Sequence, residues 1–221
     1  MDIAVDILLV AVAYLLGSIS NALWIGRLFY GVDVREYGSK NAGATNVLRT
    51  IGWKAALPVF LLDMLKGVLA VQLVRFTTYI PDTNPYVGYQ IALGAAVFIG
   101  HIFPIFSRFK GGKGVATMTG VLLSMHPYAL LIAFVVWLLV FLPTRYVSLS
   151  SICASIAFPI AVIVAFGMFL DPAETLTMKI FSVAVCAIII YTHRTNIKRL
   201  LKGKESKTVF KKKVELPPKA K

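Results

Sequence analysis

The sequence has few charged residues, and acidic residues are the rarer kind. Only 15% of its 221 residues are charged, and 10 acidic residues stand against 23 basic ones. A soluble domain of this length has about a quarter charged residues. Here 58% of the chain is hydrophobic and the mean hydropathy is +0.78. The apolar residues form runs close to the length that crosses about 30 Å of hydrocarbon, which predicts a polytopic membrane protein.

Cysteine is also scarce. Cys153 and Cys186 both lie inside apolar runs, which favours packing as small hydrophobic residues and implies no disulfide framework. The polar segments contain no His, Cys or carboxylate cluster with metal-ligand spacing, so we expect neither a metal nor a cofactor. The net charge of +13 is spread over short loops and a tail. It forms no single basic patch with interleaved aromatics, so no nucleic-acid partner is expected.

Seven apolar runs predict an all-α fold, a polytopic membrane helix bundle. The first run lacks a cationic start and is longer than a signal peptide, so we interpret it as a retained span, broken near residues 17–21. The fourth run is short for a crossing, and we expect its neighbours to bury part of it. Residues 1–205 are predicted to form one transmembrane domain, followed by a lysine-rich, disordered cytoplasmic tail at 206–221. The runs are about 3–24, 55–74, 87–106, 114–125, 127–142, 151–170 and 176–191.

The basic residues predict the orientation. If the N-terminus is outside, the inner face receives 27–54, 107–113, 143–150 and 192–221, which hold 20 of the 23 Lys and Arg residues. Positive charge concentrates on the cytoplasmic side of membrane proteins. We therefore predict an outside N-terminus, a cytoplasmic C-terminus and all polar clusters on the cytoplasmic face.

The stretch 31–54 is the most polar interruption between apolar runs. Its glycines let the backbone bring N–H groups close to a ligand, and its arginines offer a planar fork that matches phosphate. A solvated loop between membrane helices is the alternative. Beside four glycines, the stretch contains the hydroxyl and amide residues Ser39, Asn41, Thr45 and Asn46 and the cations Arg35, Lys40, Arg49 and Lys54.

A second cluster, 101–114, ends in Gly-Gly-Lys-Gly directly before the fourth run. A helix N-terminus that follows glycines presents N–H groups and a positive dipole end, both of which suit an anion. The spacing is not that of a P-loop, and the motif alone is weakly specific.

Three further features are polar. The segment 143–151 is rich in serine, and helix capping is its alternative interpretation. His193 and Asn196 share a helical face at the end of the last run, where a cationic edge that contacts anionic lipid is the alternative. Asp63 and Lys66 share a face inside the second run, and we interpret them as a pair lining a site, with mutual neutralisation as the alternative.

These clusters together resemble a known family. The motifs GSISNALWIGRLFYGVDVREYGSKNAGATNVLR, GHIFPIFSRFKGGKGVAT, RYVSLSS and HRTNIKRLLKGKE occur in that order between Gly17 and Glu205. They are similar to the integral-membrane glycerol-3-phosphate acyltransferases that use acyl phosphate, the PlsY family of bacteria. The lysine-rich tail after Glu205 has none of these motifs.

The resemblance implies acyl transfer from acyl phosphate to sn-glycerol 3-phosphate in the bacterial cytoplasmic (inner) membrane, giving 1-acylglycerol 3-phosphate (lysophosphatidic acid) and phosphate. The implied catalytic residues are Ser148, Lys113, Arg49 and His193. Ser148 would donate to a phosphate or to the developing oxyanion, and His193 with Asn196 would position glycerol 3-phosphate. The implied substrate- and phosphate-binding residues are Ser39, Asn41, Gly43, Thr45, Asn46, His101, Lys110, Gly111, Gly112, Gly114 and Asn196. Asp63 and Lys66 are added to this set from their position inside the second run and not from the resemblance.

Acyl phosphate already has a good leaving group, so positioning and charge stabilisation are expected to suffice, with His101 or His193 as general base the competing hypothesis. The H-x4-D pair of acyl-CoA-type acyltransferases is absent from the sequence. Two other classes of function are the alternatives. A transporter of a phosphorylated metabolite needs polar groups along a path to the outer face, and often repeats. A lipid-binding scaffold would explain the tail but not the glycine motifs.

Overall fold

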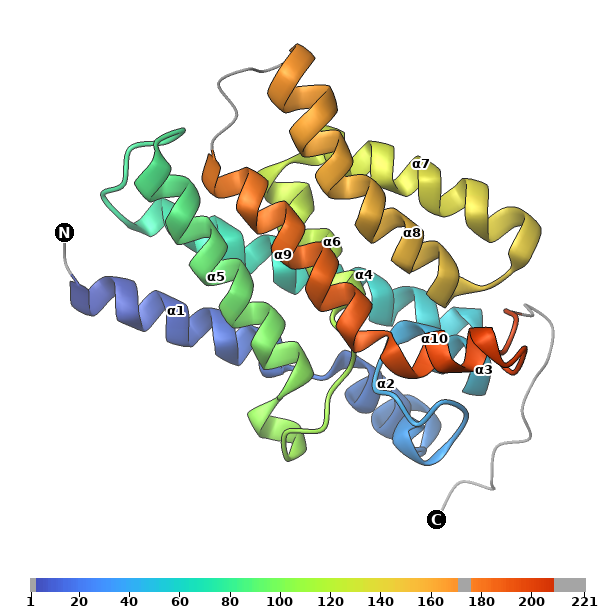
Figure 1. The fold of residues 1–221 in the computed structure, drawn as a ribbon. Helices are drawn as coiled ribbons and strands as arrows, with labels where there is room; N and C mark the ends of the chain where they lie inside the picture. Colours follow the sequence, from blue (N-terminus) through green and yellow to red (C-terminus); the bar gives the residue numbers. More distant parts are fainter. Residues whose placement is uncertain (1–2, 171–175, 209–221) are drawn as a thin grey trace. The chain divides into compact units, whose positions relative to one another are not determined.

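The computed structural model describes residues 3–170 and 176–208, except the side chains of 167–170, and this part of the chain contains helices but no strand (Figure 1). The all-α prediction is confirmed. Helix α8 continues as a π-helix, η4 (Ala161–Leu170), and the short 3₁₀ turns are η1 (Val34–Glu36), η2 (Leu73–Phe76) and η3 (Ile105–Ser107). The α-helices are α1 (Ile3–Ser18), α2 (Asn21–Tyr30), α3 (Ala44–Thr50), α4 (Trp53–Gln72), α5 (Asn84–Ile102), α6 (Val115–Met125), α7 (Pro127–Thr144), α8 (Val147–Ile160), α9 (Leu176–Thr192) and α10 (Arg194–Leu201).

Several of these helices can cross a membrane. Within the described residues, four stretches are long and apolar enough: Trp53–Phe76, Asn84–Ser107, Pro127–Thr144 and Val147–Phe166. The pairs α1–α2 and α9–α10, bent by 41° and 59°, raise the number to six if each pair is one span. The chain is therefore a multi-pass membrane protein. A seventh crossing by the shorter α6 and the orientation of the termini stay predictions.

The chain divides into two compact units, which we describe separately. Unit 1 comprises residues 3–79 and 92–124 of the described chain, and unit 2 comprises 80–91, 125–170 and 176–208. Helix α5 begins in unit 2 and ends in unit 1. The assignment of 1–205 to a single domain stays a prediction.

In unit 1, the break between α1 and α2 occurs where the sequence predicts it. A break inside an apolar environment leaves backbone carbonyls that need new donors. Lys66 Nζ on α4 supplies them, donating to Gly17 O at 3.0 Å and to Ile19 O at 2.8 Å. The lysine side chain thus stabilises the bend between α1 and α2.

Helix α6 is packed closely against α4. A Cβ atom at Gly67 would overlap the backbone oxygen of Thr117, and one at Gly120 would overlap that of Met64. Small residues permit this approach of two membrane helices. Buried residues follow one another along α6, so neighbouring helices cover much of it, as its short length predicts.

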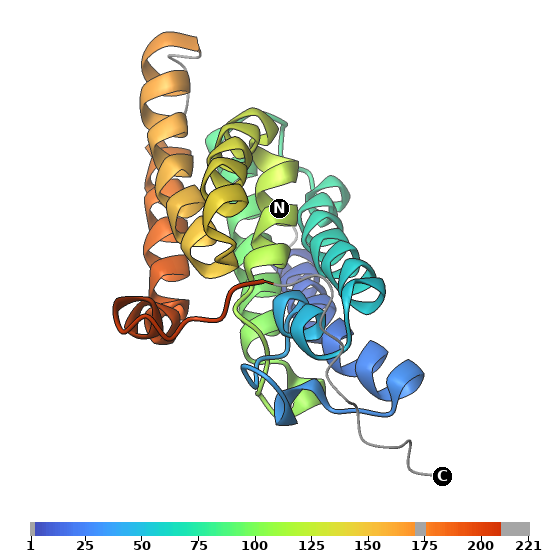
Figure 2. The ribbon, with the colours of Figure 1, turned by 90° about the vertical axis from the view of Figure 1, so that its right-hand side faces the viewer.

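In unit 2, α7 and α8 form an antiparallel hairpin and α9 packs beside α8 (Figure 2). Pro127 opens α7, and His126 Nδ1 accepts from Ala129 N–H at 3.3 Å, so the histidine caps this helix. Arg145 adopts a left-handed conformation, with φ of 61°, in the turn that reverses the chain into α8.

The segment 205–208 continues the described chain beyond α10, while the predicted disorder of the tail at 206–221 stays a prediction. Glu205 and Thr208 are buried, and Thr208 N–H donates to Arg145 O at 2.8 Å. These contacts order the segment because a buried carboxylate and backbone N–H both need partners. The rest of the predicted tail, 209–221, lies outside the described residues.

Candidate active site

In unit 1, Asn46 shapes the polar loop that precedes α3. Its Oδ1 accepts from Ser39 N at 2.8 Å and from Ser39 Oγ at 3.1 Å. Its Nδ2 donates to Val34 O at 2.7 Å and to Tyr37 O at 3.1 Å. These bonds use both amide protons and both oxygen lone pairs. Asn46 therefore acts on the loop conformation, and a direct contact with phosphate would require these bonds to be exchanged.

The other candidates of this stretch lie along the loop and α3. Ser39 is exposed and Asn41 is half-buried, and Gly43 stands at the N-terminal cap of α3. Thr45 follows in the first turn of α3, and the half-buried Arg49 lies in its last turn. The structure thus places these five residues within one loop and one short helix.

The Gly-Gly-Lys-Gly segment packs against the end of α5. Gly111 N–H donates to Ile102 O and Gly112 N–H donates to His101 O, both at 3.1 Å. A Cβ atom at Gly112 would overlap His101 Nε2 and would lie 2.8 Å from Ala42 O. Only glycine allows this approach, which brings the segment beside the loop that carries Ser39 and Asn41. The two predicted phosphate-binding clusters of unit 1 therefore adjoin.

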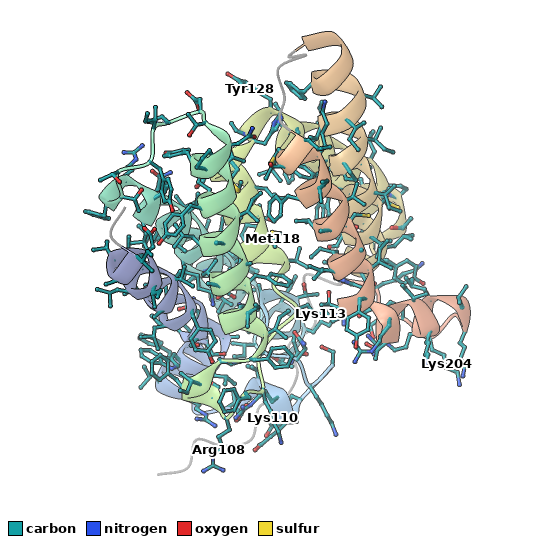
Figure 3. The ribbon with its side chains drawn as sticks, turned by 60° about the vertical axis from the view of Figure 1, so that its left-hand side comes forward. Arg108, Lys110, Lys113, Met118, Tyr128 and Lys204 are labelled. Carbon is teal, nitrogen blue, oxygen red and sulfur yellow. The ribbon has the colours of Figure 1, made fainter. Side chains whose placement is uncertain are left out.

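Basic side chains lie just before this segment and within it, ahead of α6. Lys110 is exposed and Lys113 is half-buried, and Gly114 adopts φ of 77° just before the first residue of α6. Figure 3 shows Arg108, Lys110 and Lys113 in succession ahead of Met118 on α6.

Beneath these loops lies a buried polar network. Asp63 Oδ1 accepts from Asn21 Nδ2 and pairs with Lys66 Nζ, each at 2.9 Å. His101 Nδ1 lies 3.7 Å from the same oxygen and 3.1 Å from Thr117 Oγ1. Lys66 Nζ donates its other hydrogen bonds to backbone oxygens at the α1–α2 break. This geometry favours a structural role for Asp63 and Lys66 over direct substrate contact. The imidazole of His101 lies between this network and Gly112, whose backbone packs against His101 Nε2.

Unit 2 holds a second cluster around Glu205. Its Oε1 accepts from Ser148 Oγ at 3.0 Å and from Asn196 Nδ2 at 2.8 Å. Its Oε2 accepts from Arg199 Nε at 2.6 Å. Burial raises the pKa of Glu205, but the hydrogen bonds from Arg199, Asn196 and Ser148 together outweigh it and hold the pKa below its ordinary value. Glu205 is therefore a carboxylate, and it joins two predicted site residues.

The Glu205 carboxylate changes the expected chemistry of Ser148. An ionised carboxylate only accepts hydrogen bonds, so the single hydroxyl proton of Ser148 points to Glu205. The serine oxygen then offers lone pairs. The predicted role of Ser148 as a donor to phosphate would require the hydroxyl to leave Glu205.

His193 lies at the junction between α9 and α10 and is buried. Its Nδ1 is 2.8 Å from Ile189 O, and because a carbonyl only accepts, Nδ1 carries the proton. This bond fixes the orientation of the ring. Asn196, one turn further, bonds Glu205, so the structure brings Asn196 and Ser148 together through that residue.

Sequence reasoning did not assign a role to Glu205, Arg199 or Asn21. Glu205 is the last residue of the fourth motif, and its acidic character within a lysine-rich segment is the signal that could have identified it. Among the described residues, no group of three or more His, Cys, Asp or Glu side chains is arranged to hold a metal ion. Metal-free catalysis stays a prediction.

Comparison with known proteins decides the family. The family described as "Glycerol-3-phosphate acyltransferase" matches residues 7–203. The chain belongs to the glycerol-3-phosphate acyltransferase family. A relative named glycerol-3-phosphate acyltransferase from Chlorobium phaeobacteroides (strain BS1) is 41% identical, over 92% of this chain and 97% of that relative. One of the same name from Salinibacter ruber (strain DSM 13855 / M31) is 41% identical, over 88% and 89%.

A solved structure extends this likeness to three dimensions. The crystal structure of PlsY (YgiH), an integral membrane glycerol 3-phosphate acyltransferase in its glycerol 3-phosphate form, is 42% identical with a TM-score of 0.80. The match covers 91% of this chain and 94% of the PlsY chain. The lysophosphatidic acid form of PlsY is 40% identical with a TM-score of 0.77. This glycerol-3-phosphate acyltransferase therefore shares the PlsY fold.

Proposed function

We propose that this acyltransferase moves a fatty acyl group from acyl phosphate to the 1-hydroxyl of sn-glycerol 3-phosphate. The bond between the acyl carbon and the phosphate oxygen breaks, an ester bond to the glycerol oxygen forms, and the hydroxyl proton leaves with phosphate. The products are lysophosphatidic acid and inorganic phosphate. Glycerol 3-phosphate and lysophosphatidic acid are the molecules named for the two PlsY structures, which supports both the acceptor and the product.

The adjoining loops of unit 1 support a phosphate-binding role. Thr45 and Arg49 carry hydroxyl and guanidinium donors, and Lys113 adds a cation beside the N-terminus of α6. The Ser39 hydroxyl would have to leave Asn46 Oδ1 to donate to phosphate. We assign these four residues to direct contact with substrate phosphate. Asn41, Gly43, Asn46 and Gly112 shape the loops, and Gly111, Gly114 and Lys110 flank them.

The Glu205 cluster is the observation that carries the proposal for unit 2. Glu205 fixes the rotamers of Ser148 and Asn196, and the Ser148 oxygen is left able to accept from a hydroxyl. We propose that this oxygen orients the attacking hydroxyl of glycerol 3-phosphate, while His193 and Asn196 hold the acceptor. Glu205 is a positioning residue in this scheme.

The activated donor removes the need for a strong protein base. Acyl phosphate carries a good leaving group, and its phosphate takes up the proton of the attacking hydroxyl. Catalysis then rests on orientation and on cations that stabilise developing charge. His101 is buried among Asp63, Thr117 and Gly112, which supports a structural role for it over that of a base.

We also propose the cellular setting. Residues 1–205 act as one enzyme domain in the cytoplasmic (inner) membrane of a bacterium, with an outside N-terminus and the active site at the cytoplasmic face. Apolar spans and basic loops support this placement.

The experiment is phosphate release by the purified protein from palmitoyl phosphate, with and without glycerol 3-phosphate. We expect phosphate and lysophosphatidic acid in equal amounts, only when the acceptor is present. Palmitoyl-CoA replaces the donor in a parallel reaction and should give no product. Acyl transfer from palmitoyl-CoA at a comparable rate would overturn the proposed donor.

A further inference from the structure

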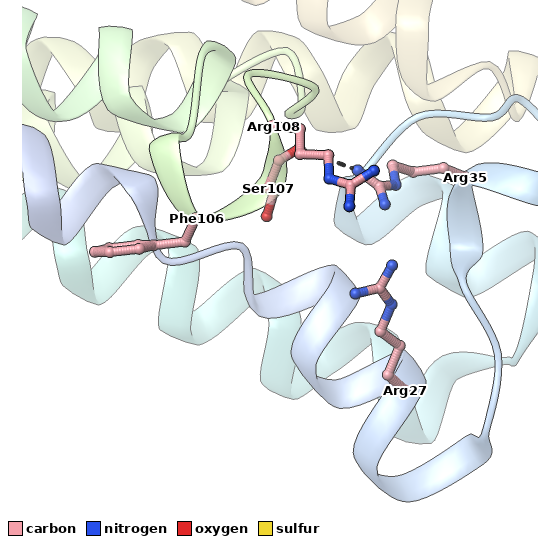
Figure 4. Close-up of a pocket in the computed structure, with 5 residues that line it drawn as sticks. All are labelled: Arg27, Arg35, Phe106, Ser107 and Arg108. Atoms are coloured by element: carbon pink, nitrogen blue, oxygen red, sulfur yellow. Dashed lines mark hydrogen bonds between the residues drawn. The ribbon is translucent and has the colours of Figure 1, made fainter.

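Unit 1 contains a pocket that includes none of the proposed substrate-binding residues. Its volume is about 240 Å³, and α2, η1 and the segment after α5 contribute to it. Figure 4 shows the guanidinium groups of Arg35 and Arg108 beside each other, with that of Arg27 directed toward them. The lining residues are Arg27, Arg35, Phe106, Ser107 and Arg108.

Two of these arginines are held in place. Asp33 Oδ2 accepts from Arg27 Nη2 at 2.7 Å and from Arg35 Nη2 at 2.8 Å. The hydrogen bonds from Arg35, with that from Arg27, hold the pKa of Asp33 well below its usual range. Arg35 Nη1 also donates to Ser107 O at 3.2 Å, which ties η1 to the segment after α5 (Figure 4). Both guanidinium groups are therefore preorganised.

The pocket has more positive charges than the nearby carboxylates neutralise. Among the residues that the structure describes, three guanidinium groups line it and no carboxylate does, while Asp33 and the exposed Glu36 supply two negative charges near Arg35. A net positive charge remains at this site. Guanidinium forks placed together match the oxygen atoms of a phosphate group.

The backbone keeps the third arginine at the pocket. Arg108 and Phe109 adopt φ of 54° and 58°, in the left-handed region that such residues rarely occupy. Phe109 N–H donates to Pro104 O at 2.9 Å and Lys110 N–H to Ser107 O at 3.2 Å, which stabilises the turn.

The apolar surroundings point to a lipid as the source of the phosphate. Phe106 lines the pocket and is 57% exposed, and Phe103 and Phe109 beside it are 54% and 57% exposed. The apolar span Asn84–Ser107 ends at the pocket, so the arginines stand at the level where a span meets headgroups. A soluble phosphate would make no use of these exposed rings.

We propose that this pocket binds the phosphate headgroup of an anionic membrane lipid, with its acyl chains along Phe103 and Phe106. The site is separate from the residues assigned to acyl transfer. It anchors η1 and the segment after α5, which lead into the two phosphate-binding loops of unit 1.

The test uses the full chain purified in a neutral detergent and titrated with dioleoyl phosphatidylglycerol or dioleoyl phosphatidylcholine. Native mass spectrometry counts the lipids that each protein retains. The variants are Arg108→Asn, whose asparagine suits the left-handed backbone, and Arg27→Gln. The matched control is Arg75→Gln. Arg75 is an exposed arginine of unit 1 in η2, directly after α4, and it does not line the pocket.

We expect one tightly held phosphatidylglycerol in the parent and in Arg75→Gln. Arg108→Asn and Arg27→Gln should bind it roughly tenfold more weakly or worse, with unchanged melting temperatures. Phe106→Ser should weaken retention of the lipid too. Equal retention by the parent and both pocket variants would overturn the proposal, as would an equal loss in Arg75→Gln. Complete displacement by millimolar inorganic phosphate would assign the pocket to a soluble anion instead.

Discussion

The buried carboxylates of the two units have similar surroundings but different consequences. Asp63 in unit 1 and Glu205 in unit 2 each accept from an amide and from a cation. Lys66, the cation beside Asp63, also donates to the backbone oxygens of Gly17 and Ile19 at the α1–α2 break. The partners of Glu205 include Ser148 and Asn196, both assigned to substrate. A carboxylate is therefore stabilising where its partner also bonds the backbone, as Lys66 does, and positioning where its partners are assigned to substrate, as Ser148 and Asn196 are.

The largest effect should come from breaking the Asp63 network. Lys66→Met removes the donors to Gly17 O and Ile19 O and leaves Asp63 buried without its cation. We expect the free energy of unfolding to fall by about 3–5 kcal/mol, the usual penalty for breaking a buried ion pair. Thermal melting in detergent measures it. Lys54→Met, an exposed lysine on the same helix, is the control, and equal melting of both variants would refute the role of Lys66.

The next effect concerns Arg49, which we place on substrate phosphate. Arg49→Lys keeps the charge but removes the planar fork. We expect a loss of about 2–4 kcal/mol of transition-state binding, or roughly a 30- to 1,000-fold decrease in kcat/KM. The measurement is phosphate release at varied glycerol 3-phosphate. Arg75→Lys should leave the rate unchanged. A variant Arg49→Lys with most of its activity would exclude a bidentate contact.

A smaller loss is expected at Glu205. Glu205→Gln weakens the bond from Arg199 and lets the Ser148 hydroxyl rotate. We expect kcat/KM to fall roughly ten- to a hundredfold, with the pH profile of the remaining activity unchanged, because Glu205 positions and does not exchange protons. Asp82→Asn, in an exposed turn, is the matched control. Disappearance of an acidic limb from the profile would make Glu205 a base.

The smallest effect is the pH dependence of stability. The hydrogen bonds around Glu205 hold its folded pKa below the ordinary 4.5, so its stabilisation is present above that pH and is lost as the pH falls through the folded pKa. The melting temperatures of the parent and Glu205→Gln should therefore differ most near neutral pH and converge in acid. A difference that stays constant from pH 7 to pH 3 would contradict the assignment.

The fold was largely predictable because apolar runs report membrane helices directly. The run 127–142 corresponds to α7 at Pro127–Thr144, and the break near 17–21 lies between α1 and α2. Two features were not predictable. The resumption of helix as far as Tyr30, and the donors that satisfy the break, depend on Lys66, far along the chain.

Residue types in the candidate site were predictable, but not which way their polar groups face. The sequence selects Asn46 by its motif and Lys66 by its charge inside an apolar run, yet only the structure shows that both bond to backbone carbonyls. Glu205 was missed because nothing near it in the sequence shows that it is buried, and one of its donors, Ser148, lies 57 positions away.

The central claim is that acyl transfer here depends on positioning an activated donor, without a protein base. The direct test is phosphate release against pH for the parent, His101→Ala and His193→Ala, at saturating and limiting glycerol 3-phosphate. We expect all three profiles to share their shape, with His193→Ala mainly raising the KM for glycerol 3-phosphate. If the parent shows a limb that vanishes in one variant while its KM is unchanged, that histidine is the base and the claim is contradicted.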